Sequence, residues 1–374
     1  MIRVLLSVVL MSGTLVLSGV ENPHGLPDGL YTRITTERGV VVCEIFFEKT
    51  PLTAVSYVGL AEGTLGPRPR KPFFENLKWH RVVAGFVIQG GDPTATGDGG
   101  PGYGFPDELV PGLRHDSAGT LQMANDGPDS NGSQYCLMLG AQQRLNYLHT
   151  VFGRVVRGLD VLPAIRQGDT MRVEILRLGD KAKVFRADDA AFAALVAKAR
   201  RYNGPKEPGP DSPFDDPDKM LPTEWARAKA FNFKLANFER FTGVRLVARV
   251  YAKVPRDAVP LQAWLRSEAT RLGVSRRGAF AAYFADQDQW HLQIGEESIG
   301  AFVETTATGE KTAVAKGMPA AMADTLAASR SAAAGFIARA EAASSPEKPV
   351  TAGHRIKLRV DAMLDTLIFK LERP

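Results

Sequence analysis

Residues 79–100 read "WHRVVAGFVIQGGDPTATGDGG" and join two short strand-like runs to a glycine-rich loop. An arginine, an aromatic ring and an amide stand in or beside these runs, at Arg81, Phe86 and Gln89. No serine–histidine or cysteine–histidine pair and no obvious cluster of metal ligands accompanies them. The stretch therefore indicates a chemistry that needs a guanidinium, an amide and apolar side chains, but no nucleophile.

Around this stretch, residues 29–178 alternate short apolar runs with Gly and Pro. The period-2 runs predict strands at residues 31–37, 40–47, 77–83, 86–89, 119–125, 133–139, 149–156 and 171–178. Apolar residues at helical spacing predict helices at residues 50–63 and 158–165. Many short strands with one helix near each end predict a mainly β fold, a closed or nearly closed antiparallel barrel.

The second half of the chain differs in class. Residues 188–202 form an alanine-rich segment with helical character, and residues 203–219 contain five prolines without an apolar period, which predicts a linker. Beyond it, helices at 224–243, 261–273 and 322–343 alternate with strands at 244–254, 278–285 and 290–295. This alternation predicts a separate α/β or α+β domain. We therefore divide the chain into 21–183, 184–218 and 219–374, and expect little contact between the two halves.

The N-terminus has the order of a secretory signal. Arg3 precedes a mainly apolar run at 4–17, the small residues Ser18 and Gly19 follow, and a polar stretch comes next. We expect residues 1–20 to be a signal peptide and the mature protein to lie in the periplasm or cell envelope. An uncleaved N-terminal anchor is the alternative. No later segment of the sequence is apolar enough to span a bilayer.

Composition and charge place the chain among soluble globular proteins. It has 374 residues, of which 44% are hydrophobic and 23% are charged. Residues 1–218 carry 23 Lys and Arg against 25 Asp and Glu, whereas residues 219–374 carry 23 against 16. Because no Lys/Arg run exceeds two residues, we interpret the basic second half as a solvated surface and expect no nucleic acid partner. The only cysteines, Cys43 and Cys136, lie in apolar runs and are interpreted as buried hydrophobes, with a disulfide as the alternative.

Three segments carry a specific resemblance. "WHRVVAGFVIQGGDPTATGDGGPGYGFPDE", "RHDSAGTLQMANDGPDSNGSQYCLML" and "HTVFGRVVRGLDVLPAI" occur in the order and spacing of the cyclophilins, a family of peptidyl-prolyl cis/trans isomerases. The resemblance covers roughly residues 30–179. It implies a cyclophilin-like β-barrel with flanking helices that acts on proline-containing peptides or unfolded proteins without a cofactor or metal.

The chemistry of this reaction agrees with the absence of a nucleophile. The rotational barrier of an amide is ~18–20 kcal/mol because twisting destroys its resonance, yet no bond is made or broken. A catalyst needs only to bind the twisted amide better than the planar forms. As resonance is lost, the prolyl nitrogen gains a lone pair, to which a fixed guanidinium donates a hydrogen bond.

The resemblance assigns the catalytic role to Arg81. It places the substrate-binding residues at Phe86, Val87, Gln89, Gly97, Ala124, Asn125, Asp126, Gln134, Cys136, Leu145 and His149. Cys136 stands where an aromatic residue is usual, and Arg144 stands where a tryptophan is often found. We therefore expect looser packing of the proline ring. A non-catalytic module that binds or chaperones Pro-containing segments is the alternative function.

Several other patterns have simpler interpretations. Residues 97–102 match G-x-G-x-x-G but lack the strand–turn–helix context of a dinucleotide site, so we interpret them as a flexible loop. Asp126 and Asp129 are interpreted as turn formers, with attraction of basic substrate residues as the alternative. We interpret three histidines as structural residues rather than metal ligands: His80, His115 and His149.

Part of the second half distantly resembles the TPM domain of exported and membrane-associated bacterial proteins. The segments are "FERFTGVRLVARVYAKVP" and "WLRSEATRLGVSRRGAFAAYFADQDQWHLQIGEESIG". We interpret residues 219–374 as a binding or docking module for an envelope protein. We interpret four acidic residues as exposed turn residues, with cation binding as the alternative: Asp286, Asp288, Glu296 and Glu297.

Overall fold

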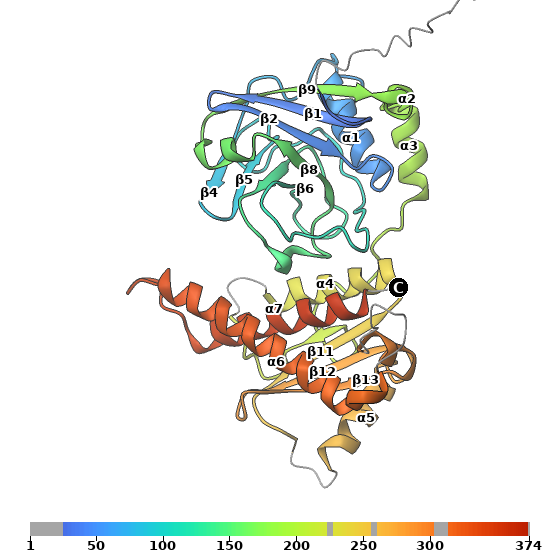
Figure 1. Cartoon of the computed structure of the whole chain (residues 1–374), viewed down its shortest axis with the longest axis vertical. Helices are drawn as coiled ribbons and strands as arrows, with labels where there is room; N and C mark the ends of the chain where they lie inside the picture. Colours follow the sequence, from blue (N-terminus) through green and yellow to red (C-terminus); the bar gives the residue numbers. More distant parts are fainter. Residues whose placement is uncertain (1–24, 223–226, 256–259, 303–312, 373–374) are drawn as a thin grey trace, which may run out of the picture.

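The computed structural model describes residues 25–222, 227–255, 260–302 and 313–372. Figure 1 shows two bodies, a β-rich one formed by the first half and a mixed one formed by the second half. The predicted signal peptide, residues 1–20, lies outside the described residues. Among the helices within these ranges, none combines the length and the apolar character needed to cross a bilayer.

The first body is a curled antiparallel sheet of nine strands in the order β3-β9-β1-β2-β8-β6-β7-β5-β4. The strands are β1 Gly29–Thr36, β2 Gly39–Ile45, β3 Leu77–Lys78, β4 Arg81–Val83, β5 Val87–Gly90, β6 Thr120–Met123, β7 Tyr135–Met138, β8 Val151–Arg157 and β9 Thr170–Leu178. The helices are α1 Pro51–Glu62, α2 Gly179–Val184 and α3 Asp189–Lys198, with single-turn to two-turn 3₁₀ helices at η1 Gln143–Leu145 and η2 Leu159–Ala164. The predicted mainly β barrel with flanking helices is confirmed.

An aromatic cluster fills the first body and holds the strands of the site in place. The fully buried Trp79 packs edge-on against Tyr135, and the ring of Tyr57 lies about 5.2 Å from both Tyr135 and Phe74. Tyr135 belongs to β7, which is hydrogen-bonded to β5 and β6. Buried side chains are close-packed, so this cluster restricts the movement of β5, β6 and β7. The side chains on the opposite face of these strands are thereby held in place.

The second body has a four-stranded sheet in the order β10-β11-β12-β13. The strands are β10 Phe214–Asp215, β11 Arg245–Tyr251, β12 Gly278–Phe284 and β13 Gln289–Ile294. The first three run parallel, and β13 is antiparallel to β12. The helices are α4 Arg227–Thr242, α5 Leu261–Arg271, η3 Glu296–Phe302, α6 Ala313–Ala342 and α7 Ala352–Leu371. The predicted α/β class of this half is confirmed.

Two apolar clusters show how the helices cover this sheet. Alternate residues of β11 face opposite sides, so that Leu246 packs with α4 and α7, whereas Val247 packs with Leu265 of α5. Strand β10 lies inside the segment interpreted as a linker, and no element was predicted for α7. The second sheet therefore begins before residue 219.

The expectation of little contact between the halves was wrong. Leu109 and Tyr147, which belong to the first body, are buried in the apolar core of the second. The ring of Tyr147 meets Phe238 edge-on at 5.0 Å, and its hydroxyl donates a 2.6 Å hydrogen bond to Glu372. Glu372 also accepts from Arg114. The two hydrogen bonds to Glu372 join residues more than 200 positions apart, which the proline-rich segment in between does not reveal.

Candidate active site

Arg81 lies at the start of a chain of hydrogen-bonded polar side chains. Strands β4 and β5 pair so that Arg81 stands opposite Gln89, and its Nη1 donates to Gln89 Oε1 at 3.1 Å. Gln89 Nε2 donates to Gln134 Oε1 at 2.9 Å, and Gln134 Nε2 donates to the carbonyls of Gly97 and Gly99. Each amide is thereby oriented by the next one. The exposed guanidinium of Arg81 is held over this face of the sheet.

An apolar cluster of side chains adjoins this polar chain, where the family resemblance places the proline pocket, and it is called the pocket below. Val87, Cys136, Met138 and Leu145 form one buried cluster, against which Phe86 and Ala124 pack. In the pairing of β5 with β7, Val87 stands opposite Met138 and Gln89 opposite Cys136. Residues that stand opposite each other in paired strands share a face, as do alternate residues of one strand. The side chains of Val87, Gln89, Cys136 and Met138 therefore lie on the same side of the sheet as Arg81.

Met138 is a pocket residue that the sequence analysis missed. Its position two residues after Cys136 in a strand is the signal that would have found it, because the strand period brings both residues to one face. Cys136 is 3% exposed and Met138 is fully buried. The floor of the pocket therefore contains a flexible thioether beside the small thiol.

Phe86 is contacted by two guanidinium groups. The Cζ atom of Arg81 lies 5.5 Å from the ring centroid of Phe86, and that of Arg144 lies 4.8 Å from it. Both distances are within the range of cation–π attraction. Arg144 Nε also donates to Gln142 Oε1 at 3.2 Å. Arg144 thus covers the aromatic wall of the pocket at the position where the family often has tryptophan.

The thiol of Cys136 and the buried imidazoles of His115 and His149 are uncharged at neutral pH. Burial raises the pKa of the Cys136 thiol to about 12. Burial also lowers the pKa of His149 to about 4 and that of His115 to about 3. Cys43 and Cys136 are both free and buried. A thiol that stays protonated is a poor nucleophile, so the site does not support covalent catalysis through cysteine.

A groove of about 720 Å³ continues from the pocket past Gln134. Ala124, Asn125 and Asp126 line one side of it, and the loop that contains Gly97 lines the other. Asp92 holds this loop, because its carboxylate accepts from the main-chain N–H groups of Thr94 and Gly97. The side chain of Asn125 is held by a 2.9 Å hydrogen bond from its Nδ2 to the carbonyl of Leu148.

The structure therefore divides the residues assigned by resemblance between the pocket and the groove. Arg81, Phe86, Val87, Gln89, Cys136 and Leu145 meet in and around the apolar pocket. His149 lies one helical turn beyond Leu145, to whose carbonyl its main-chain N–H donates. Gly97, Ala124, Asn125, Asp126 and Gln134 line the groove.

Asp129 does not attract basic substrate residues, contrary to the alternative weighed for it. Its carboxylate accepts from Arg240 at 2.7 Å and from the main-chain N–H of Tyr202 at 2.6 Å. It also accepts from the main-chain N–H of Asp107, a buried neighbour whose pKa burial raises to about 6. Asp129 is therefore part of the contact between the two bodies. Asp126 stays on the rim of the groove.

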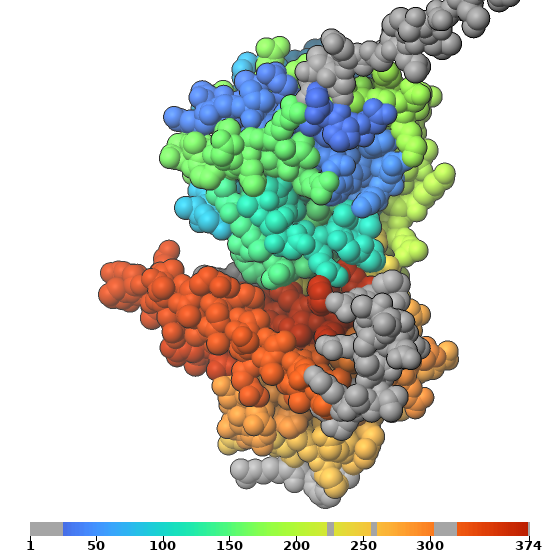
Figure 2. Space-filling view, viewed as in Figure 1, coloured from blue at the N-terminus to red at the C-terminus, as the bar shows by residue number. Residues whose placement is uncertain are grey.

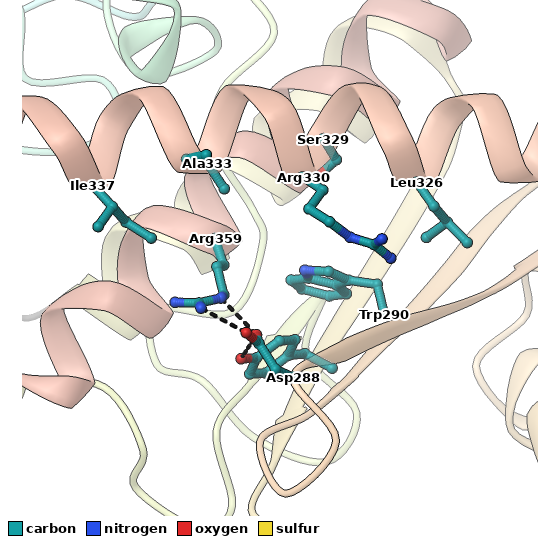
Figure 3. A pocket seen from close by; sticks show the side chains of 10 residues that line it. Asp288, Trp290, Leu326, Ser329, Arg330, Ala333, Ile337 and Arg359 are labelled. Atoms are coloured by element: carbon teal, nitrogen blue, oxygen red, sulfur yellow. Dashed lines mark hydrogen bonds and ion pairs between the residues drawn. The ribbon is translucent and has the colours of Figure 1, made fainter.

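The second body has a smaller cavity of about 180 Å³ beneath α6 (Figure 3). Asp288 on its floor accepts from the hydroxyl of Tyr283 and from the guanidinium of Arg359. Glu297 pairs with Arg276. These carboxylates are engaged by protein donors, so the cation site considered for Asp288 and Glu297 is not formed by them.

Sequence comparison with known proteins points to the family that the motifs resemble. A family model for the cyclophilin type peptidyl-prolyl cis-trans isomerases matches residues 31–181. Peptidyl-prolyl cis-trans isomerase A of Mycobacterium tuberculosis is 45% identical over 128 residues, which are 32% of this chain and 70% of that protein. Peptidyl-prolyl cis-trans isomerase-like 1 of Homo sapiens is 38% identical over 164 residues, 43% of this chain and 92% of that one. The crystal structure of a Cryptosporidium parvum cyclophilin covers 40% of this chain and 98% of its own, at 28% identity and a TM-score of 0.36.

A curled nine-stranded sheet with a guanidinium beside an apolar pocket is the arrangement expected of a prolyl isomerase. The chain belongs to the cyclophilin family of peptidyl-prolyl cis-trans isomerases, and residues 31–181 are its isomerase domain. The resemblance of the second half to the TPM domain stays a prediction.

Proposed function

We propose that the protein is exported and accelerates the cis/trans isomerisation of X–Pro bonds in exported proteins, with Arg81 as the catalytic donor. The observation that carries this proposal is the chain from Arg81 through Gln89 to Gln134 beside the pocket of Val87 and Leu145. The order of charged, apolar and small residues before residue 21 supports export.

The geometry supports a division of labour in the site. The pocket accepts the proline ring, and burial against apolar side chains removes the ring from water. Arg81 donates one N–H to Gln89, and its other N–H groups can donate to the prolyl nitrogen. A planar amide nitrogen is a poor acceptor, so this hydrogen bond forms only as the amide twists. The interaction thus stabilises the transition state rather than the ground state.

The test is a prolyl isomerisation assay on a short X–Pro peptide, together with a binding measurement. Replacing Arg81 with Ala should lower kcat by about 10²–10³ while binding of the planar peptide changes little, and Arg81→Lys should restore little of the rate. Arg172→Ala is a matched control, because Arg172 is an exposed arginine of β9 in the same sheet as Arg81 and pairs with Glu75 away from the site. Turnover by Arg81→Ala at the wild-type rate would refute the assignment.

A second candidate function is the binding of Pro-containing segments without useful turnover. The small Cys136 in the pocket and the guanidinium of Arg144 over Phe86 favour it. It predicts that a folded wild-type protein binds the X–Pro peptide but leaves its isomerisation at the uncatalysed rate. The same assay therefore separates the two functions.

A further inference from the structure

A cavity of about 600 Å³ lies between the two bodies, next to the proline pocket. Gly85 and residues 141–144 line it from the barrel, and α6 and α7 line it from the second body. Figure 2 shows the end of α6 and the start of α7, in orange and red, projecting below the barrel. The cavity therefore exists only because both halves contribute to it.

The cavity and the proline pocket share their walls. Gly85 lines the cavity and is followed in the chain by Phe86, which packs in the pocket. Arg144 likewise lines the cavity and is followed by the pocket residue Leu145. The guanidinium of Arg144 lies over the ring of Phe86 at the boundary. An extended chain advances about 3.3 Å per residue. A polypeptide whose proline occupies the pocket can therefore reach the cavity within a few residues.

The lining of the cavity is rich in cationic side chains. Arg144, Arg339 and Lys357 contribute positive charges, and His354 adds a titratable imidazole. Asp361 is the one carboxylate among the lining residues, and it pairs with Lys357 on the next turn of α7. The net charge of the lining is therefore positive.

Arg339 is the cationic group best placed to meet a ligand. Its guanidinium lies over the ring of Phe336, 5.2 Å from the centroid. Within the described part of the chain, no carboxylate forms an ion pair with it. An exposed guanidinium held by an aromatic ring is oriented for a bidentate hydrogen bond to a carboxylate.

The opposite side of the pocket has the reverse charge. The groove that runs past Gln134 has Asp98 and Asp126 among its lining residues and no Lys or Arg. A negatively charged client segment is therefore repelled from the groove and attracted to the cavity. This difference in charge places the acidic residues of a bound client on the cavity side of its proline and not on the groove side.

We infer that the cavity between the bodies binds client polypeptides that carry Asp or Glu within a few residues of the isomerised proline, on one side of it. This inference rests on the proposed prolyl isomerase function and specifies its substrate class. Residues from both bodies would then bind one substrate: the barrel binds the proline, and α6 binds the acidic residues next to it.

The test uses four peptides with the same central X–Pro bond, with three Glu or three Gln residues before or after it. Exchange rates are measured by NMR without a protease, and dissociation constants are measured in parallel. For one of the two directions, the Glu peptide should have a kcat/KM about two- to fivefold above that of its Gln partner, since a partly exposed ion pair contributes up to about 1 kcal/mol. The preference should shrink at high salt.

The decisive variant is Arg339→Glu, which should abolish or reverse the preference. Arg266→Glu is the matched control, because Arg266 is an exposed arginine on α5, which covers the other face of the second sheet. Circular dichroism and thermal melts establish that both variants are folded.

Turnover without a preference for Glu, or a preference that survives Arg339→Glu, would overturn the inference and leave the proposed function intact. An absence of turnover on all four peptides would overturn the proposed function instead. In that case the ratio of the dissociation constants of the Glu and Gln peptides decides the inference by itself.

Discussion

The ammonium group of Lys234 on α4 donates a hydrogen bond to the main-chain carbonyl of Arg144, 3.3 Å away. Arg144 stands beside Leu145 in the wall of the proline pocket, whereas Lys234 belongs to the second body. The side chain of Lys234 is 1% exposed and also pairs with Asp365 of α7. Asn237, one turn further along α4, donates to the carbonyl of Tyr147 at 3.1 Å. The second body thus holds the main chain on both sides of Leu145.

Replacing Lys234 with Met should lower the free energy of unfolding by about 3–5 kcal/mol, because it leaves the buried Asp365 without its partner. It should also lower kcat/KM, since the carbonyl of Arg144 loses its donor. Chemical denaturation and the isomerisation assay measure the two effects. The control is Lys229→Met on the same helix, where the ion pair with Glu207 is exposed.

The double variant with Lys234→Met and Asp365→Leu separates stability from positioning. Removing both charges should restore much of the stability but not the hydrogen bond to Arg144. If the double variant regains full activity, the contact does not position the pocket wall.

A fragment of residues 25–200 should fold, because its aromatic core lies entirely within the first body. It should melt about 5–10 °C below the corresponding transition of the full chain, because Leu109 and Tyr147 lose their apolar partners. It should also isomerise peptides more slowly. Equal melting temperatures and equal rates would show that the contact between the bodies carries no stabilisation.

Cys136→Phe should raise kcat/KM for an X–Pro peptide, because a larger apolar side chain at the pocket floor increases contact with the proline ring. Cys136→Ala, which removes the thiol and adds no volume, should lower it. Melting curves distinguish a change in the pocket from overpacking against Met138. An unchanged rate in a folded Cys136→Phe variant would show that the pocket is already filled.

The buried His115 should make stability depend on pH. Its folded-state pKa is about 3, whereas an unperturbed histidine has a pKa of about 6.5, so below pH 6.5 the unfolded chain binds a proton that the folded chain does not. Its contribution to stability is thus present above pH 6.5 and is lost as the pH falls toward 3. Asp107, with a raised pKa, acts in the opposite direction between pH 6 and 4.

Comparison with His115→Gln isolates the histidine. The difference in unfolding free energy between wild type and variant should shrink by about 1.4 kcal/mol for each pH unit between 6 and 4. Urea titrations at pH 7, 6, 5 and 4 measure it. A difference that stays constant over this range would mean that His115 titrates normally in the folded protein.

The mature protein should begin near residues 19–22 and occur outside the cytoplasm, as the N-terminal sequence predicts. N-terminal sequencing after cell fractionation measures this. Deleting residues 4–17 should leave the product in the cytoplasm. A full-length soluble cytoplasmic product with Met1 would contradict export.

The sequence by itself determined the class of both halves, and its family resemblance named the pocket residues apart from Met138. Strand and helix periods are local properties of the chain, so residues 29–178 and the later alternation of strands and helices were predictable without the structure. The motifs around Arg81, Asn125 and His149 likewise lie within contiguous segments, and these carry the family resemblance.

Only the tertiary structure decided how the halves meet. Lys234, Lys357 and Asp361 resemble surface residues in the sequence, because the cost of burying a charge is offset only by a partner that folding brings near. The apolar residues of α7, among them Ile356, Val360, Met363 and Leu367, do recur at helical spacing, so a local signal for this helix was present in the sequence. Strand β10 contributes two residues and is stabilised by β11, more than 30 residues later, so no local pattern marks it. The cavity beside Phe86 depends on these long-range contacts, and for that reason its charge was visible only after folding.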